Sequence, residues 1–196
     1  MKSKLFIVIV LMSMSLIFSS CAKFPQVQID TTTAAIQTAK DAGADVYVPE
    51  VYQALVDSMN SATVKAETVK SKWFPNYKQV NELLVATTDS AVKAIVKVEV
   101  RKSELKVENE TLLCEVKELV VSNRELLTKA PKGKDGKAAL AAIDTELSVV
   151  ETTLTEVETL STNGELLEAN SKVKAAKEKS LSIKAELEVA IEKVKR

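Results

Sequence analysis

The long run without glycine or proline from Asn76 to Thr128 limits this chain's fold more than any other feature. Glycine and proline are the residues that most often end helices, so their absence favours one continuous helix. At roughly 1.5 Å per residue, that helix would be about 80 Å long. Ala, Val, Leu, Lys and Glu dominate throughout, and the whole sequence has only four glycines and four prolines. This composition predicts an all-α protein of elongated helical hairpins, packed as a coiled-coil-like bundle with one long central helix.

Apolar residues recur along this segment with heptad spacing. Asn109 and Asn123 are interleaved with a row of leucines seven residues apart: Leu105, Leu112, Leu119 and Leu126. This pattern is typical of a zipper between two chains, in which buried asparagines set the register. Leu113, Val120 and Leu127 widen the apolar stripe, and a wide stripe favours burial within a bundle of three or four helices. Both interpretations remain open, with packing inside one chain favoured.

Glycine and proline mark a corner early in the chain. Gly43 is expected to end a helix over residues 30–42, and Pro49 suits the first position of the next helix. Tyr47 and Tyr52 are placed to pack across this corner and to fix its angle.

The predicted organisation follows from these breaks. It comprises a tether over 21–29, an N-terminal helical hairpin with the long helix over 30–129, a loop over 130–136 and a C-terminal helical hairpin over 137–196. The helices before and after the long helix are each expected to lie antiparallel along one half of it. The apolar positions of residues 52–91 also match those of residues 140–180, so two hairpins share one layout.

The N-terminus has the features of an export signal. Lys2 and Lys4 precede an apolar run from Leu5 to Phe18 that is too short to span a membrane. The cysteine behind this run, Cys21, resembles the lipobox cysteine of bacterial lipoproteins. The resemblance implies a signal peptide over 1–20 and a lipid anchor on Cys21. Ala22 then fits export to the outer membrane, with the protein facing the periplasm.

A second resemblance lies in residues 42–52, which read AGADVYVPEVY. An A-G-A-x-x-Y-x-P-E-x-Y element behind a lipobox resembles a family of bacterial helical lipoproteins of unknown function, whose Ala-rich helices are somewhat like tetratricopeptide repeats. The similarity covers residues 21–100 and departs just before Tyr77, where the family tends to have Gly-Asp-Tyr. It implies a membrane-anchored helical protein and supplies no catalytic residues.

The sequence argues against catalysis, metal binding and nucleic-acid binding. It contains no histidine, which removes His-based acid–base catalysis and most zinc sites. The mature chain is nearly neutral, so no nucleic-acid surface is expected. The glutamates of the long helix alternate with basic residues, which favours a solvated face of ion pairs over a metal site: Glu104, Glu108, Glu110, Glu115, Glu118 and Glu125. No catalytic residue, cofactor or metal is predicted, and Cys114 is interpreted as a packing residue rather than a free or bridging thiol.

Trp73 and Phe74 are expected at the tip of a hairpin, where they either cap its core or contact a partner or lipid surface. Together these features predict a membrane-anchored lipoprotein that acts as a non-catalytic scaffold in the cell envelope. Its partner is the membrane, through the lipid, with an envelope protein or a second copy. The alternatives are a self-assembling coiled-coil spacer, held by the leucine row, and an activator of an envelope enzyme.

Overall fold

The structure, a computed structural model, describes residues 23–131 and 136–195. Six helices are assigned in this part of the chain, which contains no strand, so the predicted all-α fold with one long helix is confirmed. The predicted signal peptide and Cys21 lie outside the described residues. The chain divides into two compact units, residues 1–98 and 99–196, and the division falls within the long helix α5, Lys78–Lys129.

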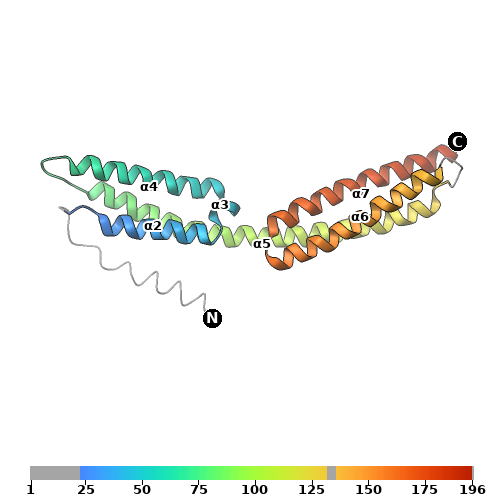
Figure 1. The fold of residues 1–196 in the computed structure, drawn as a ribbon, viewed down its shortest axis with the longest axis horizontal. Coiled ribbons are helices and arrows are strands. Elements are labelled where there is room, and N and C mark those ends of the chain that lie inside the picture. Colours follow the sequence, from blue (N-terminus) through green and yellow to red (C-terminus); the bar gives the residue numbers. More distant parts are fainter. Residues whose placement is uncertain (1–22, 132–135, 196) are drawn as a thin grey trace. The chain divides into compact units, whose positions relative to one another are not determined.

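Unit 1 is a bundle of three long helices. Helix α2, Gln26–Asp41, and helix α4, Pro49–Lys70, pack with the N-terminal part of α5 (Figure 1). Helix α2 begins at Gln26, earlier than the predicted start at Asp30. The reason is tertiary packing, because Phe24 and Ile29 lie against a cluster formed by Ala62, Ala66, Tyr77, Val80 and Leu84. The segment predicted as a tether is therefore helical from Gln26 onward.

The corner of unit 1 is built as the sequence indicates. Gly43 has φ 97°, a left-handed conformation that glycine adopts without strain, and it ends α2. A single turn, α3 (Ala44–Tyr47), leads to Pro49 at the first position of α4. Tyr47 and Tyr52 pack against the second core cluster of this unit, which draws on α2, α4 and α5: Ile36, Ala39, Ala44, Leu55, Ala91, Ala94 and Val98.

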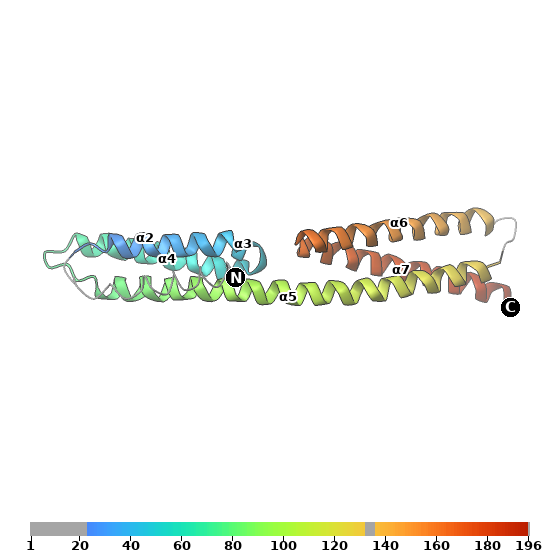
Figure 2. The same cartoon turned by 90° about the horizontal axis from the view of Figure 1, so that it is seen from below.

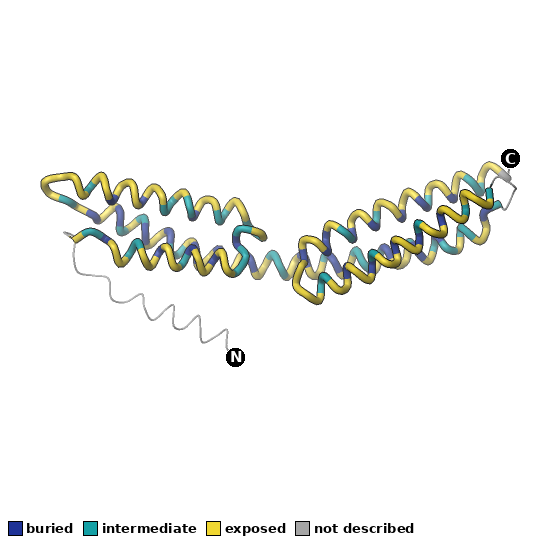
Figure 3. The backbone as a smooth tube through the Cα atoms, in the orientation of Figure 1, coloured by how far each residue is buried: buried dark blue, intermediate teal, exposed yellow. Residues whose placement is uncertain are grey.

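Unit 2 is a second bundle of three helices. The C-terminal part of α5 packs with α6, Gly136–Asn163, and α7, Leu166–Lys195 (Figure 2). Gly164, at φ 84°, makes the turn between α6 and α7. Burial follows the inward faces of the helices (Figure 3). One cluster is centred on Val116, Val157 and Val173, and the other on Leu147, Ile183 and Leu187.

The shared layout predicted for two hairpins corresponds to the second and third helices of each bundle. Leu55 on α4 and Ile143 on α6 are both buried, and so are Leu84 on α5 and Val173 on α7. Each unit adds a first helix that runs parallel to its third, α2 in unit 1 and the C-terminal part of α5 in unit 2. Helix α5 thus serves as the third helix of one bundle and the first helix of the next.

Candidate interaction surfaces

The leucine row of α5 faces into unit 2. Leu105 has no exposed surface, and the other three leucines of the row are half-buried. Leu112 packs against the cluster around Val116, and Leu126 packs against the cluster around Leu147. The row therefore has partners within its own chain, on α6 and α7, and Leu105 is not available as a surface contact.

The two asparagines of the row fix how α5 lies along α7. Asn109 donates a hydrogen bond from Nδ2 to the carbonyl oxygen of Leu166 at 2.9 Å, and its Oδ1 accepts one from Asn170 at 2.7 Å. Asn123 likewise donates to the carbonyl oxygen of Ser180 at 2.8 Å. Both buried Nδ2 groups find a backbone acceptor on α7, so these bonds select one register of the two helices.

Ion pairs join all three helices of unit 2. From α5, Glu108 and Glu115 pair with Lys174 and Lys177 of α7, at 2.7 Å and 2.6 Å. Lys117 reaches Glu158 of α6 at 2.6 Å. The sequence predicts these charges as a solvated face of ion pairs at helical spacing. Of the predicted glutamates, Glu104 pairs with Arg101 one turn away on α5 (3.4 Å), whereas Glu108 and Glu115 hold α7 to α5.

Arg124 makes the most extensive of these contacts. It donates to both carboxylate oxygens of Glu151, at 3.1 Å and 2.9 Å, and also bonds Asp144 and the hydroxyl of Ser148. The hydrogen bonding of Arg124 to Glu151 is the main reason that the pKa of Arg124 is raised. The pKa of Glu108 is lowered, first by its hydrogen bond with Lys174 and then by one with Asn170.

The face of α5 opposite the leucine row carries a second apolar row, which the sequence interpretation missed. Val100, Val107 and Val121 are 53–61% exposed, and Cys114, which is also exposed, continues their seven-residue spacing. Residues seven apart lie on one face of a helix, so these four form a stripe, called here the valine row. The spacing is visible in the sequence. Because this row has only one apolar residue per heptad, its sequence pattern is weaker than that of the broad leucine stripe. The exposure of Cys114 also corrects its interpretation as a packing residue.

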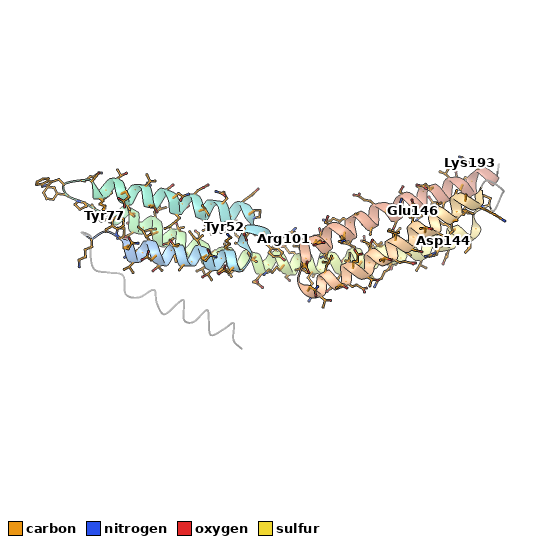
Figure 4. All side chains as sticks on the ribbon, in the orientation of Figure 1. Tyr52, Tyr77, Arg101, Asp144, Glu146 and Lys193 are labelled. Atoms are coloured by element: carbon orange, nitrogen blue, oxygen red, sulfur yellow. The ribbon has the colours of Figure 1, made fainter. Side chains whose placement is uncertain are left out.

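The tip of unit 1 carries the two most exposed large hydrophobic side chains of the described residues. Trp73 is 90% exposed and Phe74 is 83% exposed, in the loop between α4 and α5. They do not cap the hairpin core. Tyr77, at the start of α5, fills that place: it is 2% exposed, and its ring lies edge-on to Phe24 with centroids 5.8 Å apart (Figure 4).

Concave sites are shallow in both units. One groove runs between α4 and α5 past Leu55 and Ala94, and another between α6 and α7 past Val150 and Ala176. Within residues 23–131 and 136–195, no three acidic or cysteine side chains are grouped to hold a metal ion. Among the same residues, no helix combines the length and the apolar character that crossing a membrane requires.

No protein-family profile matches this chain, and neither a curated protein nor a solved structure is significantly similar to it. The resemblance to helical lipoproteins therefore stays a prediction.

Proposed function

We propose that the mature chain is a lipid-anchored, non-catalytic scaffold of the bacterial cell envelope, which binds an envelope protein through the outer face of α5. The observation that carries this proposal is the valine row. Val100, Val107 and Val121 are exposed, while the leucine row on the other side of the same helix is occupied by α6 and α7. One helix thus has a side that holds the bundle together and a side free for a partner.

The chemistry of the valine row indicates the kind of partner. The row is narrow, with one apolar residue per heptad, and extends about 30 Å from Val100 to Val121 at roughly 1.5 Å per residue. Exposed charges of both signs flank it: Glu104, Glu110, Glu118, Lys97 and Lys117. A complementary surface is an amphipathic helix with an apolar stripe and charges of both signs beside it.

The location rests on the N-terminal sequence. The basic start, the short apolar run and Cys21 support export and lipid attachment. A lipid on Cys21 would hold unit 1 close to the membrane, because α2 begins at Gln26, only a few residues later. Outer-membrane sorting is supported by Ala22 behind the cysteine.

The competing proposal of self-assembly through the leucine row has less support. Those leucines already pack within unit 2, so pairing two chains through them would require the bundle to open. A second copy that docks on the valine row remains a distinct outcome, and the experiment below separates it from a different protein.

The test is cross-linking in living cells, followed by mass spectrometry, with a photo-reactive residue in place of Val107. We expect cross-links to one distinct envelope protein. The same residue in place of Thr152, an exposed position on α6, is the matched control and should give far fewer. Cross-links only between copies of this chain would overturn the scaffold proposal. The mass of the N-terminal peptide tests the anchor separately, because a lipid on Cys21 adds a characteristic mass.

A further inference from the structure

The aromatic tip of unit 1 belongs to none of the hydrophobic clusters formed by the described residues. Trp73 and Phe74 are 90% and 83% exposed, and the hairpin core beneath them is closed by Tyr77 and Phe24. Two neighbouring large apolar side chains held in water are costly to keep exposed, since each loses the benefit of burial. An external surface that covers them would recover that free energy.

The charge around the tip is basic. Lys70, Lys72 and Lys78 are exposed, and the sequence from Thr68 to Asn81 contains no acidic residue. Lys70 also pairs with Glu67 and lies 4.9 Å from the centroid of the Phe24 ring. Tryptophan and phenylalanine flanked by lysines are typical of segments that enter the headgroup region of an anionic membrane.

The tip lies at the end of unit 1 from which the chain leaves toward Cys21. Phe24 contacts both Tyr77 and Lys70, so the start of α2 and the loop between α4 and α5 share one end of the bundle (Figures 1 and 4). Cys21 lies three positions before Phe24, and an extended chain spans at most about 11 Å over that interval. A lipid on Cys21 would therefore be attached within about 11 Å of Phe24, at the same end of unit 1 as the aromatic tip.

The size of the tip favours a membrane over a protein. Trp73 and Phe74 offer only a few hundred Å² of apolar surface, whereas a stable protein interface buries at least about 1,200 Å². A membrane contact can be smaller when a lipid already anchors the protein. A second, weaker contact with the membrane then adds to the binding that the lipid provides.

We propose that the Trp73–Phe74 tip inserts into the interface of the same membrane that holds the lipid on Cys21, as a second anchor. This inference rests on the lipid anchor of the proposed function, and it assigns the tip to lipid rather than to a protein. The two contacts at one end of unit 1 make that end the membrane-facing end.

Trp73 is the only tryptophan of the chain, so its fluorescence reports on the tip alone. The experiment uses the mature lipidated protein, purified from membranes and reconstituted into vesicles of phosphatidylethanolamine and phosphatidylglycerol. We expect Trp73 emission to be blue-shifted, quenched by bromine atoms on acyl carbons close to the headgroup, and severalfold less sensitive to iodide in the water than a free indole. An emission that iodide quenches as it quenches a free indole would overturn the proposal.

Two variants serve as controls. Trp73→Phe combined with Val46→Trp moves the single tryptophan to α3, at the other end of the same unit, where Val46 is 57% exposed. Its emission should stay sensitive to iodide and insensitive to the brominated lipid. Phe74→Ser keeps the reporter and removes half of the apolar tip, so the quenching of Trp73 by lipid should fall severalfold. All three substituted positions are exposed, so the helical content measured by circular dichroism should be unchanged.

The outcomes separate this proposal from the previous one. If the N-terminal peptide is lipidated but iodide quenches Trp73 freely, the lipid anchor stands and the proposed membrane contact of the tip is overturned. Cross-links from position 74 to one envelope protein in cells, in place of lipid quenching, would assign the tip to a protein and overturn the inference. Loss of the cross-links at position 107 alone would overturn the scaffold and leave the tip proposal standing.

Discussion

The side-chain amide of Asn123 donates a hydrogen bond to the carbonyl oxygen of Ser180, 57 residues further along the chain. The same separation joins Asn109 to Leu166. Two contacts with one separation mean that α5 and α7 run parallel, with both pairs two heptads apart on each helix. Unit 1 has a counterpart, because Thr32 of α2 donates to the carbonyl oxygen of Leu84 at 3.3 Å and lies 3.0 Å from the hydroxyl of Thr88. In both bundles, buried polar side chains set the register between the first and third helices.

Replacing Asn109 by alanine should destabilise unit 2 by about 1–3 kcal/mol, because the change also removes one acceptor from the amide of Asn170. Ser180→Ala is the contrasting variant. Its hydroxyl is fully buried and has no hydrogen-bond partner among the described residues, so its removal should be neutral or stabilise by about 0.5–1 kcal/mol. Urea denaturation followed by circular dichroism measures both, and a larger loss for Ser180→Ala than for Asn109→Ala would contradict the assignment.

Arg124→Met should cost about 0.5–1 kcal/mol of unfolding free energy, since it breaks the link from α5 to two carboxylates on α6. The loss should shrink at high salt, which screens half-exposed charges. Arg101→Met is the matched variant. It breaks a pair with Glu104 one turn away on the same helix, and should cost no more than about 0.5 kcal/mol. Equal costs for the two variants would show that the contact between helices adds nothing.

The lowered pKa of Glu108 predicts a dependence of stability on pH. The folded state binds the proton of this carboxyl group less tightly than the unfolded state does. The contribution of Glu108 is therefore present above its unfolded pKa and is lost as pH falls through its lower folded pKa. The free-energy gap between wild type and Glu108→Gln should be largest above the ordinary pKa of glutamate, about 4.3, and should shrink as the pH falls below it. The same comparison in a Lys174→Gln background should show a much smaller change with pH, because Lys174 is the main cause of the shift.

Gly43→Ala should destabilise unit 1 by about 1–2 kcal/mol, because Gly43 has a positive φ that an L-residue adopts at a cost. An added Cβ would also lie 3.0 Å from Cδ2 of Tyr47. Gly164 has a similar φ of 84°, yet the space around its missing Cβ is open. Gly164→Ala should therefore cost less than Gly43→Ala. Thermal unfolding of both variants measures the two losses of stability. A larger loss for Gly164→Ala would show that the side chain of Tyr47 moves aside at no cost.

Helix positions were predictable where glycine, proline and heptad spacing mark them. Pro49 begins α4 and Gly43 ends α2 because backbone conformation at these residues is a local property. The start of α2 was missed because it depends on the contact of Phe24 with Tyr77, and no local pattern records a contact between such distant residues.

The surfaces were harder to predict than the helices. Asn109 and Asn123 were recognised as residues that set a register, but their acceptors are backbone carbonyls of α7. Every residue carries a carbonyl group, so the sequence does not reveal which one is the partner. Exposure separates the leucine row from the valine row of α5, and exposure depends on which side α6 and α7 cover. Trp73 and Phe74 were placed at a tip, but only the packing of Tyr77 beneath them shows that the core is already closed.

The exposed position of Cys114 makes its thiol a reference for testing the proposed lipid attachment at Cys21. A thioether to a lipid would consume the thiol of Cys21, which leaves Cys114 as the single group able to react with a maleimide in the folded protein. A precursor that keeps its signal peptide has two cysteines, Cys21 and Cys114. Titration of free thiols per chain thus distinguishes precursor from lipoprotein without any measurement on the lipid itself.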